Sequence, residues 1–173
     1  MKLKPIAFKA NLVRAILDGK KTVTRRIAHE DKSPKYSTGD TLYIREAFAV
    51  LGAPPNIDIL YKADFPNDPR EGTNTPRPQW RPAIHMPKNI ARLILTITGV
   101  RKEKLLKITE EGAKAEGCEV RQEFATPFFM SARENFKNLW NDIYLLKGLG
   151  WETNPEVYVY EFEVKKRERK LKI

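Results

Sequence analysis

Residues 16–26 read Ile16-Leu-Asp-Gly-Lys-Lys-Thr-Val-Thr-Arg-Arg26 and join a predicted helix to a predicted strand. Apolar residues at helical spacing predict the helix over 10–18, and Gly19 is placed to end it. Four cations and two threonine hydroxyls then follow within positions 20–26. A cleft lined by such side chains would bind a phosphate or polarise an acyl oxygen.

The same segment contains a nucleophile and a base. A threonine hydroxyl attacks an acyl carbon when a base takes its proton, and a neutral lysine can be that base. Neighbouring cations would lower the pKa of Lys21 toward the useful range. On a straight strand Lys21 and Thr24 point to opposite faces, so a direct pair requires a turn or bulge near Thr22 and Val23. The alternative is a solvated basic turn, and the single glycine excludes a nucleotide-binding phosphate loop.

Length and composition predict one packed domain. The chain has 173 residues, of which 41% are hydrophobic and 31% charged. We expect the domain to span 1–164 and a basic tail to span 165–173. The net charge is +10, and the tail carries +5 of it, from six basic residues minus one acidic residue. Such an excess favours a polyanionic partner, chiefly RNA, although a basic tail can also be only solvated.

Cysteine and histidine are too few for several classes of site. The single cysteine, Cys118, excludes an intramolecular disulfide. Together with only two histidines, His29 and His85, it predicts no metal site, and no cofactor is expected. No apolar run approaches the ~20 residues that span a bilayer, so we expect a cytoplasmic protein with no membrane partner.

The remaining pattern predicts an α+β fold. Strands are expected at 41–48, 59–63, 92–100 and 157–164, with helices at 109–116 and 131–146. Residues 51–56 and 64–81 are rich in proline and glycine and are expected to be loops. This order favours a small mixed or antiparallel β-barrel with flanking helices, in which the last strand pairs with an early one.

Two further groups of side chains are candidates for binding. Arg45 and Glu46 end a predicted strand and are expected to face opposite sides of it, so that one can point inward; a salt bridge is the alternative to a binding role. Aromatic and basic residues alternate around 80–88, as suits a stacked base beside a phosphate: Trp80, Arg81, His85 and Lys88. The alternative is that Trp80 packs the loop onto the domain.

Several motifs, in order, resemble the ASCH (activating-signal-cointegrator homology) domain of the PUA-like superfamily. Residues 16–26 resemble its signature, and the resemblance covers nearly the whole chain before the tail. The pattern is similar to the larger ASCH proteins of bacteriophages and prophages. The other matching segments are Gly39-Asp40, Leu42-Tyr-Ile-Arg-Glu46, Trp80-Arg-Pro-Ala-Ile-His-Met-Pro87, Leu95-Thr-Ile-Thr-Gly-Val100, Ile108-Thr-Glu-Glu-Gly-Ala-Lys-Ala-Glu-Gly117, Trp140, Asn154-Pro155 and 157–162.

The resemblance implies a PUA-like fold with a cleft for RNA or a modified nucleoside. Compact bacterial members remove the acetyl group from N4-acetylcytidine with a lysine, a threonine three positions later and a distant glutamate. These positions match Lys21, Thr24 and Glu116. Segment 51–91 has no counterpart in the compact enzymes and is expected to be an insertion. The residues expected to bind substrate or RNA are Lys20, Arg25, Arg26, Arg45, Glu46, Trp80, Arg81, His85 and Lys88.

Two other functions stay open at this stage. A non-catalytic RNA-binding module would use the same basic and aromatic residues to follow a phosphate backbone. A ribonuclease would need an acid and a base beside that backbone, which His85 or Lys21 with Glu46 could supply.

Overall fold

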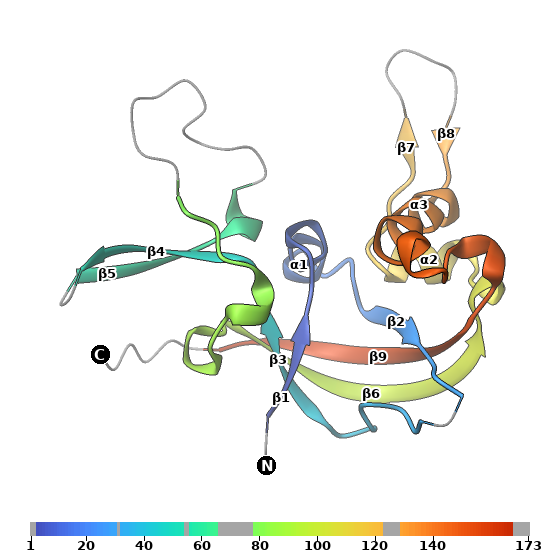
Figure 1. Cartoon of the computed structure of the whole chain (residues 1–173), viewed down its shortest axis with the longest axis horizontal. Helices are drawn as coiled ribbons and strands as arrows, with labels where there is room; N and C mark the ends of the chain where they lie inside the picture. Colours follow the sequence, from blue (N-terminus) through green and yellow to red (C-terminus); the bar gives the residue numbers. More distant parts are fainter. Residues whose placement is uncertain (1–2, 31, 54–55, 66–77, 123–128, 168–173) are drawn as a thin grey trace. The chain divides into compact units, whose positions relative to one another are not determined.

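The computed structural model describes residues 3–30, 32–53, 56–65, 78–122 and 129–167 (Figure 1). The chain divides into two compact units. Unit 1 comprises Met1–Leu17, Asp40–Thr96 and Val164–Ile173, and unit 2 comprises Asp18–Gly39 and Ile97–Glu163. No helix in the described part of the chain is long and apolar enough to cross a membrane.

Five strands are hydrogen-bonded in the order β1-β3-β6-β9-β2. Strand β1 runs parallel to β3, whereas β3 with β6 and β2 with β9 are antiparallel. The predicted α+β fold is therefore confirmed, and so is the pairing of the last strand with an early one. Closure of the sheet into a barrel stays a prediction. The bounds are β1 Lys4–Ala7, β2 Val23–Ile27, β3 Thr41–Arg45, β6 Leu93–Lys104 and β9 Glu156–Lys166.

Unit 1 contains helix α1 (Ala10–Leu17), which buries the apolar stripe predicted for it. It also contains an antiparallel pair, β4 (Phe48–Ala53) with β5 (Asn56–Tyr61), where the sequence predicted a loop over 51–56. For 51–53 and 56 that prediction was wrong, because Gly52 holds a φ of 79° within the strand; residues 54–55 lie outside the described part of the chain. Short 3₁₀ turns follow at η1 Lys62–Asp64, η2 Ala83–His85 and η3 Lys88–Ile90. Most of the predicted loop 64–81 lies outside the described residues.

One buried cluster of unit 1 is largely aromatic. Its buried members come from β3, the β4–β5 pair and the segment that leads into β6: Tyr43, Phe48, Tyr61, Met86 and Ala91. The Tyr61 hydroxyl donates to the Ile90 carbonyl at 2.6 Å, which fastens β5 to the chain just before β6.

Unit 2 contains helices α2 (Glu110–Ala115) and α3 (Ala132–Tyr144), which lie side by side (Figure 1). Ser131 and Glu134 form a capping box at the start of α3, which confirms the helix predicted from 131. The buried face of α3, chiefly Phe136 and Trp140, packs in one cluster with Val157 and Val159 of β9. The remaining elements are η4 Leu105–Lys107, β7 Arg121–Gln122, β8 Phe129–Met130, η5 Leu145–Lys147 and η6 Trp151–Thr153.

Candidate functional site

The backbone places Lys21 beside the end of α2. Lys21 forms an isolated antiparallel bridge with Glu116, and the Thr22 amide donates to the Ala115 carbonyl at 2.9 Å. The Phe162 amide of β9 in turn donates to the Thr22 carbonyl at 3.0 Å. The segment that leads into β2 is therefore held between α2 and β9, all within unit 2.

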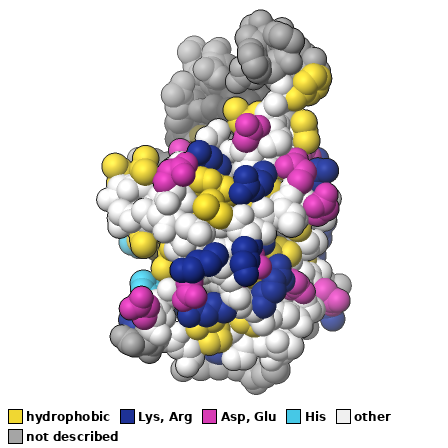
Figure 2. Space-filling model, turned by 90° about the vertical axis from the view of Figure 1, so that its right-hand side faces the viewer, with side chains coloured by type: hydrophobic (Ala, Val, Ile, Leu, Met, Phe, Trp, Pro, Cys, Tyr) yellow, Lys and Arg dark blue, Asp and Glu magenta, His cyan; other side chains and the backbone are white. Residues whose placement is uncertain are grey.

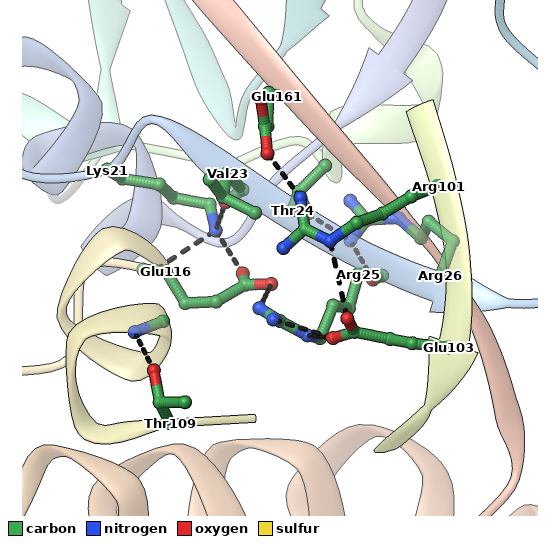
Figure 3. A network of polar contacts seen from close by, with 11 residues as sticks. Lys21, Val23, Thr24, Arg25, Arg26, Arg101, Glu103, Thr109, Glu116 and Glu161 are labelled. Carbon is green, nitrogen blue, oxygen red and sulfur yellow. Dashed lines mark hydrogen bonds and ion pairs between the residues drawn. The ribbon is translucent and has the colours of Figure 1, made fainter. Parts of the chain in front are cut away.

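The ammonium group of Lys21 donates to three acceptors (Figure 3). It donates to Glu116 Oε2 at 2.5 Å, to the Glu116 carbonyl at 3.0 Å and to the Val23 carbonyl at 2.7 Å. Three acceptors match the three N–H groups of a charged lysine. Lys21 is only 1% exposed, and this burial lowers its pKa even though the Glu116 carboxylate acts in the opposite direction.

Arg25 binds the other oxygen of the same carboxylate. Its Nη1 donates to Glu116 Oε1 at 3.2 Å, and its Nη2 donates to Glu103 Oε1 at 2.9 Å. Arg25 is 4% exposed, and its guanidinium lies over the Phe136 ring at 5.9 Å from the centroid. Arg25 was expected to bind substrate or RNA, yet the structure directs its donors to two carboxylates within unit 2.

The network continues to the surface along β6 and β9. Arg101 donates to Glu103 at 3.3 Å and forms an ion pair with Glu161. Both Arg101 and Glu161 have half-exposed side chains, whereas the Glu103 side chain is 17% exposed. Figure 3 shows this chain of alternating charges running from the Lys21–Glu116 pair outward.

Thr24 lies one position before Arg25 in β2 and is also buried. Its hydroxyl accepts a hydrogen bond of 2.6 Å from Arg26 Nη1, and the same nitrogen donates to the Arg25 carbonyl at 2.9 Å. Because side chains alternate along a strand, Thr24 and Arg26 share one face of β2 and Arg25 takes the other. Arg26 is half-buried and is the part of this pair that reaches toward solvent.

Lys20 lies apart from this buried group. Its side chain is 52% exposed and forms an ion pair with Glu119, whose side chain is also exposed. The Glu119 contact raises the pKa of Lys20, which therefore carries a full charge at the surface.

Within unit 1, the predicted residue Glu46 is fully buried and paired. Both of its oxygens accept from Arg92, at 2.8 and 2.9 Å, and Arg92 also donates to Asp64 at 2.8 Å. The Arg92 guanidinium lies over the Tyr61 ring at 4.1 Å. The salt-bridge alternative stated above for Glu46 describes this arrangement, and Arg92 was not singled out in the sequence.

Arg45 also lies in unit 1, and its side chain faces neighbouring residues. It donates to the Tyr43 hydroxyl at 3.0 Å and to the Ile84 carbonyl at 3.2 Å. The guanidinium lies 5.5 Å from the centroid of the Tyr43 ring. These contacts fasten the end of β3 to η2.

The other predicted residues of unit 1 lie along the segment that follows the undescribed stretch. Trp80 contacts the Phe65 ring at a centroid distance of 6.0 Å, which fits the packing alternative. Arg81 pairs through its backbone with Phe48, and its side chain is exposed. His85 and Lys88 are exposed in η2 and at the start of η3.

Unit 2 also contains a pocket of about 560 Å³ that none of the predicted site residues lines. Its lining includes the apolar residues Ile27, Leu149 and Pro155 and the exposed cations Lys32 and Lys104. Among the residues that the structure describes, no group of three or more His, Cys, Asp or Glu side chains is placed to hold a metal ion.

Comparison with known proteins supports the fold. No family model matches the chain, and no curated protein matches it. The solved structure of protein EF3133 from Enterococcus faecalis V583, described as family-model DUF984, matches with a TM-score of 0.50 and 14% identity, over 96% of this chain and 82% of that one. At this identity the likeness shows the fold alone.

A second solved structure is that of an ASCH domain from Lactobacillus crispatus JV V101. The sequence motifs described above resemble the same family. This structure matches with a TM-score of 0.49 and 14% identity, over 95% of this chain and 81% of that one. The fold assignment rests on the Enterococcus structure, since a match at this TM-score adds no independent support. A phage-type origin and an acetylcytidine activity stay predictions.

Proposed function

We propose that the chain is a nucleoside- or RNA-directed protein, and that its unit 2 site hydrolyses the N4-acetyl amide of acetylcytidine. The observation that carries the proposal is the buried Lys21–Glu116 pair, which lies close in sequence to Thr24. The Thr24 hydroxyl accepts a hydrogen bond of 2.6 Å from Arg26. Acyl transfer requires a base, a hydroxyl and a cation held in place. Lys21 suits the role of the base because burial lowers its pKa.

The reaction would proceed in two balanced halves. In the first, the Thr24 oxygen forms a bond to the acetyl carbon while Lys21, neutral, takes the hydroxyl proton. The amide C–N bond then breaks, and Lys21 returns that proton to the leaving amine of cytidine. In the second, water attacks the acetyl-threonine ester with Lys21 again taking and returning a proton. Acetate leaves and the threonine hydroxyl is restored.

The other charged groups have separate roles in this scheme. Glu116 holds the lysine side chain in place through the 2.5 Å contact. Arg26 would stabilise the negative charge that develops on the acetyl oxygen, because its guanidinium already lies at the attacking hydroxyl.

The test follows the conversion of N4-acetylcytidine to cytidine by chromatography, with the wild-type protein, Thr24→Val and Thr22→Val. Thr22 is the matched control, because it is an exposed threonine two positions away. We expect Thr24→Val to lose at least about a thousandfold in rate and Thr22→Val to keep wild-type turnover. No conversion by the folded wild-type protein, or full turnover by Thr24→Val, would refute the amidohydrolase.

A second candidate function is non-catalytic RNA binding. The observation that favours it is burial, since Lys21 and Thr24 are each 1% exposed. Lys and Arg side chains gather on the face shown in Figure 2, with Asp and Glu side chains among them. Two exposed lysines, Lys32 and Lys104, also line the pocket of unit 2. Such a surface would bind RNA through its phosphates.

Salt dependence separates the two candidates. The affinity for a short single-stranded RNA is measured by fluorescence anisotropy at ~50–200 mM salt, the range over which phosphate contacts weaken. For a phosphate-binding module this affinity should fall steeply as the salt concentration rises. Turnover of a free nucleoside should change little over that range. Cleavage of the RNA in the same samples would instead favour the third candidate, a ribonuclease.

A further inference from the structure

The buried part of the site contains two cations that share one carboxylate. Lys21 and Arg25 have side chains only 1% and 3% exposed, and each binds a different oxygen of Glu116, whose side chain is 4% exposed. Arginine stays charged under all ordinary conditions, whereas a buried lysine exchanges its proton more readily. Of the two cations, Lys21 is therefore the one that can change its charge.

The hydrogen bonds of Lys21 show what would happen if it lost a proton. A neutral amine has two N–H groups, and the carbonyls of Val23 and Glu116, at 2.7 and 3.0 Å, would accept both. The contact with Glu116 Oε2 would be the one given up. The Glu116 carboxylate would then be buried without its lysine, which is costly for an ionised group that has no other partner.

Arg25 supplies that other partner. Its Nη1 lies 3.2 Å from Glu116 Oε1, and its second carboxylate contact, to Glu103, anchors the guanidinium in place. A neutral Lys21 would leave behind a complete Arg25–Glu116 ion pair.

We propose that Arg25 is a positioning residue: its guanidinium keeps the Glu116 carboxylate paired, and so allows Lys21 to give up its proton inside the unit. The inference rests on the proposed function at one point, since a neutral Lys21 is the base in the proposed reaction. It replaces the expectation that Arg25 binds substrate or RNA.

The charged and titratable groups that face Lys21 come from several elements. Glu116 ends α2, Arg25 and Arg26 lie in β2, and Cys118 follows α2. The positive charge of Arg26 favours the neutral lysine and the Cys118 thiol group opposes it. The side chains beyond Arg25, which act on Lys21 through it, are Glu103, Arg101 and Glu161.

The test measures the protonation of Lys21 directly, in the full-length protein. Lysine labelled with carbon-13 at Cε is titrated by NMR, and the Lys21 signal is assigned by its loss in Lys21→Arg. We expect Arg25→Gln to raise the pKa of Lys21 by about one unit or more, because a nearby positive charge is removed and Glu116 needs the lysine proton. An unchanged or lowered pKa in folded Arg25→Gln would overturn the inference.

A second variant serves if Arg25→Gln does not fold. Glu103→Gln removes the competing carboxylate of Arg25 and leaves Glu116 untouched, so the pKa of Lys21 should fall. A pKa that stays the same or rises in this variant would also overturn the inference. Turnover of N4-acetylcytidine is measured separately: a wild-type protein that lacks turnover, but whose Lys21 pKa responds as stated, would refute the proposed function and leave this inference standing.

Discussion

Glu116 divides its carboxylate between two buried cations, with Lys21 at 2.5 Å from Oε2 and Arg25 at 3.2 Å from Oε1. Glu116→Gln would keep the size of the side chain and remove its charge. Lys21 would then lack its counter-charge, Arg25 would keep only Glu103, and the amide NH₂ would meet a donor. We expect the free energy of unfolding to fall by about 3–5 kcal/mol.

Urea unfolding followed by circular dichroism measures this loss. Glu119→Gln is the matched control, since Glu119 is an exposed glutamate whose partner is the exposed Lys20. Its effect should stay within about 0.5 kcal/mol. Equal losses in the two variants would show that the buried carboxylate has no special role in stability.

The lowered pKa of Lys21 makes stability depend on pH with a definite sign. Between the folded-state pKa and the ordinary value of 10.5, the unfolded chain binds the proton and the folded chain does not. The contribution of Lys21 to the free energy of unfolding must therefore rise as the pH rises through that interval, and its cost is fully present below the folded-state pKa.

Lys21→Met removes this dependence. Urea unfolding of the wild-type protein and the variant at several pH values from neutral to about 10.5 should show the wild type gaining stability relative to the variant as the pH increases. A difference that stays constant with pH, or that changes in the opposite direction, would contradict the lowered pKa.

Much of the fold could be predicted from local patterns. Helix α3 was predictable because Ser131 can cap it, Glu134 lies in its first turn and an apolar stripe follows, and the structure places it at Ala132–Tyr144. The pair β4–β5 was missed because Gly52 and two following prolines are typical of a loop. Gly52 nevertheless fits a strand there, since glycine tolerates a positive φ.

The candidate site was predictable in part. The Lys21, Thr24 and Glu116 positions came from motif similarity, and the Lys21–Glu116 contact spans 95 positions that no local pattern joins. Glu103 was missed because the apolar alternation of its strand stops near Val100, while β6 continues to Lys104. Which way the charged residues of 20–26 would point depended on α2 and β6, which lie far away in the sequence.

In unit 1, Arg92 donates to both carboxylate oxygens of Glu46, which is only 1% exposed. Arg92→Met would keep much of the side-chain volume over Tyr61 but remove both charged donors that Arg92 gives to the Glu46 carboxylate. We expect a loss of about 3–5 kcal/mol in the free energy of unfolding.

Arg81→Met is the control for this prediction, because the Arg81 side chain is exposed and its contacts with Phe48 are made by the backbone. It should change the free energy of unfolding by no more than about 0.5 kcal/mol. If Arg92→Met were as stable as Arg81→Met in urea unfolding, the buried pair would have to be compensated elsewhere in unit 1.

Substitution of Arg26 distinguishes a catalytic role from a substrate-binding role at the proposed site. Its guanidinium donates to the Thr24 hydroxyl at 2.6 Å, so under the acyl-transfer scheme Arg26→Gln should lower kcat for N4-acetylcytidine by about 10²–10³-fold and change KM little. The unfolding free energy should stay near the wild-type value, because Arg26 is only half-buried.

Steady-state kinetics of Arg26→Gln, beside Lys114→Gln as an exposed-cation control on α2, provides the measurement. Lys114→Gln should leave both constants at their wild-type values. A loss confined to KM would assign Arg26 to substrate binding, because an interaction made equally in the ground state and the transition state changes KM alone. The developing charge on the acetyl oxygen would then need another donor, and the role given to Arg26 would be wrong.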